Sequence, residues 1–300
     1  MKPISFIFFC YLSFSLAVAS EDNLRDRDFS AENWAQTCED WDLWDKPGPP
    51  FKLFGNTYYV GTCGISSILI TSSAGHVLID SGTRLGARVV IENIKKLGFD
   101  PLDIKVLLHS HEHHDHVGGL DYIKTSTGAR LFTSQGALGA ISSGTPSQQD
   151  PQYGMLKVME PVEVDGIIEE GQHVKLGMLE LNPLVTPGHT PGALSWQWRS
   201  CELNKCAVFV YADSLSPVSS EVYRFSDFKN YLSAYRTSIE KISTLECDIL
   251  IAPHPSAAKL RARIESQQSL IGKDGCGNYA NHLNQRLARR LEKENKEEPN

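Results

Sequence analysis

The chain has 300 residues, of which 41% are hydrophobic and 22% are charged, which is the balance of a globular protein. The 29 Lys and Arg residues against 36 Asp and Glu residues give a formal net charge of −7. The chain therefore lacks the basic excess that would neutralise the phosphates of a nucleic acid. Composition excludes a disordered chain and argues against a nuclease or another nucleic-acid-binding protein.

The N-terminal residues have the pattern of a secretory signal peptide. Lys2 precedes an almost wholly apolar run at positions 4–18, and the small residues Ala17-Val18-Ala19 end it. This A-x-A pattern predicts cleavage at its end. The alternative is a membrane anchor, but no later apolar run reaches the ~20 residues that span a bilayer. We therefore expect residues 1–20 to be a signal peptide, and residues 21–300 to form a single exported domain without a membrane anchor.

The rest of the chain alternates predicted strands and helices. Aromatic and β-branched residues predict strands at residues 51–60, 65–71, 75–80, 104–108, 129–132, 173–176, 178–185, 193–198, 207–211 and 249–252. Apolar residues at helical spacing predict helices at residues 84–97, after Gly119, and at 225–245, 257–269 and 278–296. Residues 144–161 have the composition of a loop. Two similar halves, each of strands followed by helices, fit two packed β-sheets with helices on the outer faces.

Export changes how the cysteines are interpreted. The chain has seven, and one of them, Cys10, lies in the apolar N-terminal run. An even number in an oxidising compartment suggests three disulfides, whose pairing the sequence alone does not fix. Zinc binding by these thiols is the rival interpretation, but the chain contains no CxxC pair. The six cysteines are Cys38, Cys63, Cys201, Cys206, Cys247 and Cys276.

Five of the ten histidines lie between positions 109 and 116, directly after a predicted strand. In extended backbone, residues i and i+2 point the same way, so His111 and His113 can present imidazoles to one ion. Asp115 and His116 lie at the turn into the next helix and can face a second ion. Neutral imidazole and carboxylate are ligands that suit Zn²⁺. The pattern therefore predicts a metal site rather than a solvated polar loop.

Two more histidines occupy the same context, a strand end followed by a turn. His189 lies at the centre of TPGHTPG, and His254 lies in IAPHP. The remaining histidines lack this context or leave their role open. His109 and His114 are each either a hydrogen-bond donor that supports a ligand residue or simply exposed. His76, His173 and His282 are expected to be structural or on the surface.

Several segments together carry a resemblance to a known family. GNTYYVGTCGIS, HSHEHHDHVGG, TPGHTPGALSWQW, YADSLS and CDILIAPHP resemble the subclass B3 metallo-β-lactamases, especially the AIM-type enzymes, over roughly residues 38–290. The HxHxDH motif alone is typical of the whole metallo-β-lactamase superfamily, which includes glyoxalase II, lactonases and nucleases. A serine, Ser214, stands where other subclasses have a zinc-ligating cysteine, and this points to subclass B3.

The resemblance implies an α/β fold, the four-layer αβ/βα sandwich of metallo-β-lactamases, with two mixed β-sheets, helices on the outer faces and the site at the sheet edges. It implies two Zn²⁺ ions, the first bound by His111, His113 and His189 and the second by Asp115, His116 and His254. Asp115 would also orient the nucleophile, Ser214 would hold a water or support a ligand, and Ser216 would help to seat the substrate carboxylate. The implied disulfides are Cys38–Cys63, Cys201–Cys206 and Cys247–Cys276.

The implied function is periplasmic, zinc-dependent hydrolysis of the β-lactam amide bond by a metal-bound hydroxide. Its substrates would be small molecules, the penicillins, cephalosporins and carbapenems, and the activity would confer antibiotic resistance. We expect a monomer. One alternative is another exported dizinc hydrolase of the same fold that acts on lactones or thioesters. A second is a non-catalytic zinc-binding protein, which would be expected to lack a ligand, whereas all six candidates are present.

Asp213 separates these hypotheses. In glyoxalase II and related phosphodiesterases, an aspartate in a similar segment bridges both metals, and Ala212-Asp213-Ser214 can be aligned with it. The preferred interpretation is that Asp213 accepts a hydrogen bond from a ligand histidine. Direct contact of Asp213 with metal would give more weight to ester or thioester substrates.

Overall fold

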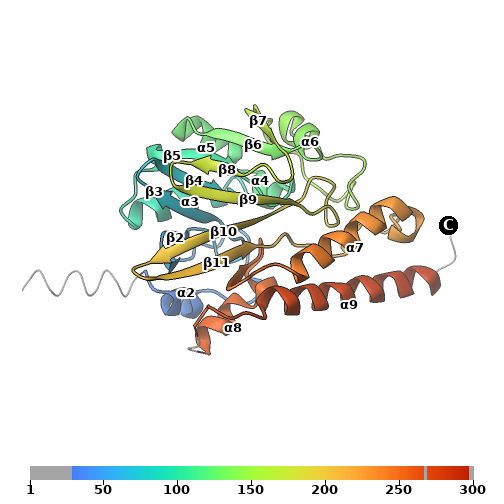
Figure 1. The fold of residues 1–300 in the computed structure, drawn as a ribbon. Coiled ribbons are helices and arrows are strands. Elements are labelled where there is room, and N and C mark those ends of the chain that lie inside the picture. The colour runs from blue at the N-terminus through green and yellow to red at the C-terminus, as the bar shows by residue number, and fades with distance from the viewer. Residues whose placement is uncertain (1–28, 267–268, 297–300) are drawn as a thin grey trace, which may run out of the picture.

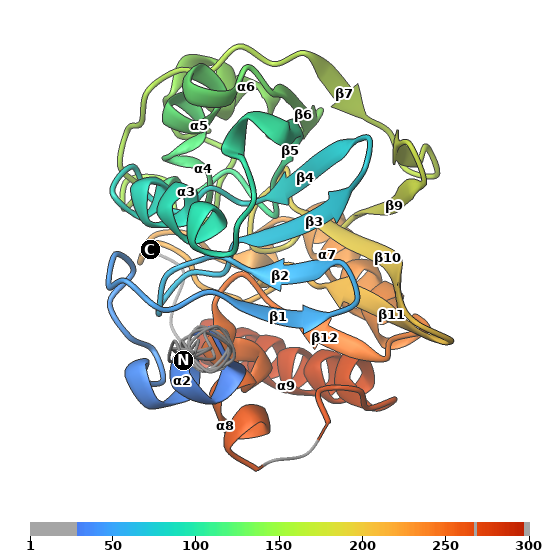
Figure 2. The same cartoon turned by 90° about the vertical axis from the view of Figure 1, so that its left-hand side faces the viewer.

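The computed structural model describes residues 29–266 and 269–296. Two β-sheets pack face to face in these ranges, with helices on their outer faces (Figures 1 and 2). The predicted signal peptide lies outside the described residues. None of the described helices combines the length and the hydropathy that crossing a membrane requires.

The first sheet has seven strands in chain order, antiparallel from β1 to β4 and parallel from β4 to β7. Its strands are β1 (Phe51–Phe54), β2 (Thr57–Tyr59), β3 (Ile68–Ser72), β4 (Gly75–Ile79), β5 (Ile104–Leu108), β6 (Arg130–Ser134) and β7 (Gly166–Ile168). The second sheet has five strands in the order β12-β11-β10-β9-β8, and only the β11–β12 pair is parallel. Its strands are β8 (Val174–Leu176), β9 (Leu179–Val185), β10 (Leu194–Glu202), β11 (Lys205–Tyr211) and β12 (Ile249–Ile251).

The helices lie on the outside of this sandwich. They are α2 (Ala31–Thr37), α3 (Gly86–Lys96), α4 (His114–Val117), α5 (Leu120–Thr127), α6 (Leu138–Ser143), α7 (Lys229–Ser243), α8 (Leu260–Glu265) and α9 (Gly275–Lys296), with short 3₁₀ turns η1 (Pro101–Asp103), η2 (Phe225–Asp227) and η3 (Pro255–Ala258). The long helices α7 and α9 run side by side against the five-stranded sheet (Figure 1).

Side chains alternate between two hydrophobic cores along the central strands. In β3, Ile68 and Ile70 enter the core between the sheets, whereas Leu69 enters the core under α3 and α5. In β5, Val106 and Leu107 divide in the same way. A sheet that is buried on both faces needs nearly continuous apolar strands, which is the pattern that the sequence shows. The predicted αβ/βα architecture is confirmed.

Several predicted elements differ from the structure in their bounds, and two of them show why. The single strand predicted at 51–60 is a hairpin, because Gly55 turns the chain at φ 58° and a Cβ there would meet the Ser200 hydroxyl at 2.3 Å. The helix predicted at 257–269 is interrupted by Lys259, which has the left-handed φ of 52°. The short elements α2, α6 and β7 were not predicted.

The described residues form three disulfides, one of them within the β10–β11 hairpin. The structure pairs Cys38 with Cys63, Cys201 with Cys206, and Cys247 with Cys276. These are the pairs that the family resemblance implied. The last of them joins the start of α9 to the segment that leads into β12, and α9 is the helix that lines one side of the site described below.

Candidate metal centre

The histidine-rich segment begins where β5 leaves the sheet. β5 runs parallel between β4 and β6, and the carboxyl ends of such strands are where open α/β sheets place their ligands. His113 has extended backbone, and α4 starts at His114. Because the backbone changes from strand to helix here, His111 and His113 lie in one donor cluster, and Asp115 and His116 lie in a neighbouring one.

The first donor cluster combines three predicted ligands. His111, His113 and His189 are buried and offer one nitrogen each, and these atoms lie within 4.8 Å of one another. The ring centroids of His111 lie 4.8 Å from those of both partners, and those of His113 and His189 lie 5.0 Å apart. One ion can contact all three nitrogens at ordinary metal–nitrogen distances.

The second donor cluster is centred on Asp115. Its Oδ2 lies 3.1 Å from His116 Nε2 and 3.5 Å from His254 Nε2. His111, Asp115 and His116 also offer atoms within 4.8 Å of one another, so the two clusters are adjacent. All six predicted ligands are therefore brought together at one place, from the β5–α4 turn and from the loops after β9 and β12.

Asp213 sets the orientation of His111. His111 Nδ1 donates to Asp213 Oδ1 at 2.7 Å, and Oδ2 of the same carboxylate accepts from the Leu215 N–H at 3.1 Å. His111 Nε2 is buried without a hydrogen-bond partner in the described structure. The free nitrogen of His111 faces the cluster, and Asp213 has the role of acceptor that the preferred interpretation gave it.

His113 and His189 are fixed by partners of a different kind. Asp150, in the loop after α6, lies 3.0 Å from His113 Nε2, which leaves Nδ1 for the cluster. His189 Nδ1 lies 2.9 Å from the Ser216 carbonyl and 3.0 Å from the Ser216 hydroxyl. His189 Nε2 therefore faces the cluster, where the Gln152 amide lies 3.3 Å from it. Ser216 therefore positions a ligand in addition to lining the site. No sequence pattern pointed to Asp150, an ordinary loop residue that only the fold brings to His113.

Asp80 supports His116 from behind. The carboxylate is fully buried at the end of β4 and lies 3.3 Å from His116 Nδ1. It also accepts from the Ser110 N–H at 2.6 Å and from the Tyr211 hydroxyl at 2.7 Å. Asp80 was not among the predicted site residues, although an aspartate at the end of an apolar strand was an available signal.

Glu112, between two predicted ligands, ties the histidine-rich segment to the loop of His189. The carboxylate is buried and accepts from the Thr190 hydroxyl at 2.6 Å and from the Gly192 N–H at 2.9 Å. The turn that carries His111 and His113 is thus held against the turn that carries His189, which fixes the geometry of the first cluster.

The electrostatics of the clusters fit a cation. Burial lowers the pKa of His111 and of His189 well below the ordinary value and lowers that of His254 to about 4, so these imidazoles are neutral, as metal ligands must be. Burial also opposes the charged form of His116, yet Asp115 and Asp80 raise its pKa to about 10. A divalent ion would compete with that proton. Buried nitrogen and carboxylate donors with unpartnered atoms therefore fit a divalent metal.

The other histidines have structural or peripheral roles, with one exception. His109 is buried against the Thr133 hydroxyl at 2.7 Å, His76 is buried under Phe99, and His173 is exposed beside Glu180. His282, expected to be structural or on the surface, lines the cavity that opens on the clusters.

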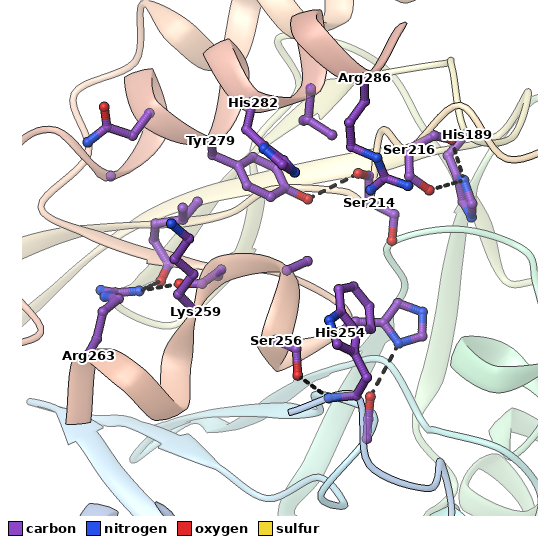
Figure 3. A pocket seen from close by; sticks show the side chains of 18 of the residues that line it. His189, Ser214, Ser216, His254, Ser256, Lys259, Arg263, Tyr279, His282 and Arg286 are labelled. Carbon is purple, nitrogen blue, oxygen red and sulfur yellow. Dashed lines mark hydrogen bonds between the residues drawn. The ribbon is translucent and has the colours of Figure 1, made fainter. Parts of the chain in front are cut away.

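This cavity has a volume of about 1270 Å³ and runs from the donor clusters towards α9 (Figure 3). Trp41 and Trp44 stand at the metal end and are largely exposed, with ring centroids 6.1 Å from that of His254. Ser214 is 6% exposed, and its hydroxyl has no hydrogen-bond partner in the described structure. Of the predicted site residues, the cavity is lined by His113, Asp115, His189, Ser214, Ser216 and His254.

A four-layer αβ/βα sandwich with adjacent His/Asp clusters at its sheet edges defines a metal-dependent hydrolase. The family model of the metallo-β-lactamase superfamily matches residues 60–203. The MIM-2 metallo-β-lactamase structure is 53% identical, covers 88% of this chain and 98% of its own, and has a TM-score of 0.85. The structure of MIM-1 from Novosphingobium pentaromativorans is 42% identical, covers 89% of this chain and 99% of its own, and has a TM-score of 0.86. The structure of MEM-A1, a subclass B3 metallo-β-lactamase from a soil metagenome library, is 40% identical, covers 85% of this chain and 99% of its own, and has a TM-score of 0.81.

More distant relatives have other activities in their names. The probable metallo-hydrolase YqgX of Bacillus subtilis is 25% identical over 48% of this chain and 65% of its own length. The hydroxyacylglutathione hydrolase GloC of Haemophilus influenzae is 27% identical over 62% of this chain and 82% of its own length. The chain thus spans less than two thirds of YqgX. Coverage and identity are far higher for the solved lactamases, and the chain belongs to the metallo-β-lactamase superfamily, subclass B3.

Proposed function

We propose that this chain is a zinc-dependent β-lactamase that hydrolyses the β-lactam amide of penicillins, cephalosporins and carbapenems. The observation that carries the proposal is the pair of adjacent buried clusters that open on one cavity. The activity named in the titles of its similar structures supports the choice of substrate. Such an activity confers resistance to β-lactam antibiotics.

His111, His113 and His189 would hold one zinc ion, and Asp115, His116 and His254 would hold the other. Zinc, when bound, lowers the pKa of a coordinated water towards neutrality and polarises a carbonyl oxygen. No serine nucleophile is then needed.

The remaining chemistry belongs to the protein's own groups. Asp115 lies between His116 and His254, where its carboxylate can orient the attacking water as well as bind metal. Asp213, Asp150 and the Ser216 carbonyl hold the ligand imidazoles in place, so that no reorganisation is needed when the lactam arrives. The free hydroxyl of Ser214 faces the same cavity and is available to a polar group of the substrate.

We place the mature protein in the periplasm as a monomer. The periplasmic location is supported by the signal-peptide pattern at residues 1–20 and by three disulfides, which persist in oxidising compartments.

Hydrolysis assays on zinc-loaded protein that starts at residue 21 test this function. We expect chelator-sensitive turnover of a carbapenem and a chromogenic cephalosporin, abolished in His189→Ala. A lactone and a glutathione thioester serve as competing substrates, because some relatives are named hydroxyacylglutathione hydrolases. Protein that holds two zinc ions but turns over only the thioester or the lactone would contradict the proposal.

A further inference from the structure

Two separate loops support the histidines of the first donor cluster. Asp150, in the loop after α6, contacts Nε2 of His113. Ser216, in the segment after β11, contacts Nδ1 of His189 (Figure 3). Both contacts orient an imidazole through the nitrogen that does not face the cluster. The spacing of the two imidazoles therefore depends on how these two loops lie relative to each other.

A backbone hydrogen bond joins the two loops close to these contacts. The N–H of Ser220, four positions after Ser216, donates to the carbonyl of Pro151 at 2.8 Å. Pro151 follows Asp150 directly in the chain. A displacement of Ser220 would therefore change the relative position of the two residues that orient His113 and His189.

Ser220 lies in a turn, residues 219–223, that has little packing of its own. Glu221 and Val222 at its tip are exposed, and the exposed fraction of Val222 is 87%. Segments with few buried contacts open at a low cost in free energy. The turn therefore needs a contact from another element to keep Ser220 in place.

Arg290, on α9, supplies this contact. Its Nη2 donates to the Ser219 hydroxyl at 2.8 Å and to the Tyr223 carbonyl at 2.7 Å, which are the two ends of the turn. Its Nε donates to the buried carboxylate of Glu294 at 2.7 Å, which fixes the guanidinium. A planar guanidinium has five donors in a fixed geometry and can serve these three oxygens at once, whereas a lysine ammonium is a single point charge.

We propose that Arg290 is a positioning residue for the first donor cluster. Acting through the 219–223 turn and its bond to Pro151, Arg290 holds His113 and His189 at the spacing that one zinc ion requires. In the described part of the chain, Arg290 does not line the cavity, so it acts through other residues. The inference rests on the proposed function, because that function assigns one zinc ion to each cluster.

The second cluster is supported from elsewhere in the fold. Asp80 lies 3.3 Å from His116 Nδ1, and the Gly64 carbonyl lies 3.3 Å from His254 Nδ1. Neither Asp80 nor Gly64 belongs to the two loops that Ser220 joins. Loss of the Arg290 contacts should therefore weaken the binding of one zinc ion and leave the binding of the other unchanged.

Zinc titrations of two parent variants test this expectation. His254→Ala disables the second cluster and His189→Ala disables the first, so each parent reports on one ion. Adding Arg290→Gln to His254→Ala should lower zinc affinity about three- to tenfold, less than the 10–100-fold that is typical of a direct partner of a ligand. Adding it to His189→Ala should leave zinc affinity unchanged. Competition with a chromogenic chelator measures the affinity in each protein.

Four further substitutions in the His254→Ala parent separate positioning from stability. Arg290→Lys keeps the positive charge and should restore part of the affinity. Ser219→Ala removes one of the oxygens that Arg290 contacts and should give a smaller loss in the same direction. Glu294→Gln should lower the thermal midpoint but leave zinc affinity at the parent value, because the contacts of Arg290 with the turn remain. Arg289→Gln, at an exposed neighbour, should change neither quantity.

The outcomes separate this inference from the proposed function. Unchanged zinc affinity of the first cluster in Arg290→Gln and in Ser219→Ala overturns the inference, and Ser219→Ala decides alone if Arg290→Gln does not fold. An equal loss in the two parents also overturns it, because a general defect would not distinguish the clusters. A wild-type protein that binds two zinc ions but hydrolyses no β-lactam overturns the proposed function alone. A wild-type protein that binds no zinc overturns both.

Discussion

Carboxylates that hold imidazoles recur around the metal clusters. Asp213 contacts Nδ1 of His111, and Asp150 contacts Nε2 of His113. In each histidine the other ring nitrogen is left for metal. Such partners fix the tautomer and the ring orientation of a ligand, and they raise its basicity. The ligand geometry therefore depends on residues that need not touch metal.

Replacing Asp213 by Asn tests this dependence. An amide cannot accept from both His111 Nδ1–H and the Leu215 N–H with equal strength, so zinc affinity should fall by about 10–100-fold. Competition with a chromogenic chelator measures the affinity. The exposed Asp227, changed to Asn, is the matched control. Equal zinc affinity in the Asp213 and Asp227 variants would show that the hydrogen bond does not support the site.

Sequence reasoning identified the six candidate ligands but not most of their supports. The ligands have a local signature, a histidine or aspartate just after an apolar strand. Asp150 and Asp80 reach His113 and His116 from 37 and 36 positions away, across contacts that only the folded chain creates.

At the scale of elements, strands were predicted best where both faces are buried. β5 was predicted with its observed bounds because Ile104–Leu108 is apolar apart from the exposed Lys105. Short elements such as β7 and α6 carry too few residues to show a period. The break at Lys259 depends on a left-handed backbone conformation that no local residue preference demands.

The disulfides should differ in their contribution to stability. Chain-entropy arguments assign about 3–4 kcal/mol to Cys247–Cys276, with its separation of 29 residues, and about 2 kcal/mol to Cys201–Cys206, with a separation of 5. Urea unfolding of the two double Cys→Ala variants measures both. A larger loss from the hairpin disulfide than from Cys247–Cys276 would contradict this ranking.

Near its C-terminal end, α9 is joined to the turn η2 by the carboxylate of Glu294. Glu294, 1% exposed, accepts from the Arg290 guanidinium at 2.7 Å and from the N–H groups of Phe225 and Ser226 at 3.0 and 2.9 Å. Burial alone would raise the pKa of Glu294, but these donors lower it below its ordinary value.

We expect Glu294→Gln to lower the free energy of unfolding by about 1–3 kcal/mol at pH 7. The contribution of a carboxylate with a lowered pKa is complete above its unfolded value of ~4.3 and is lost as the pH falls through the folded value. The difference between wild type and variant in urea unfolding should therefore narrow between pH 6 and pH 3.5. A constant difference over that range would show that ionisation of Glu294 is not responsible.

At the scale of the whole molecule, metal should stabilise the fold. An ion that binds only the folded state adds about 2.7 kcal/mol when its free concentration is 100 times Kd. Zinc should raise the thermal midpoint of the chelator-treated protein by several degrees, and His254→Ala should reduce this rise. His173→Ala, at an exposed histidine away from the clusters, should retain it. No zinc-dependent shift in the wild type would contradict the metal assignment.

The distribution of ligands along the chain has a consequence for biosynthesis. His111, His113, Asp115 and His116 are made early, whereas His189 and His254 follow much later. A polypeptide that crosses a membrane with its N-terminus first offers four ligands on an unfinished sandwich and cannot complete either cluster. For a chain exported as we propose, the identity of the bound metal would be decided by the ions available where the chain finishes folding, and not by those present where it is translated.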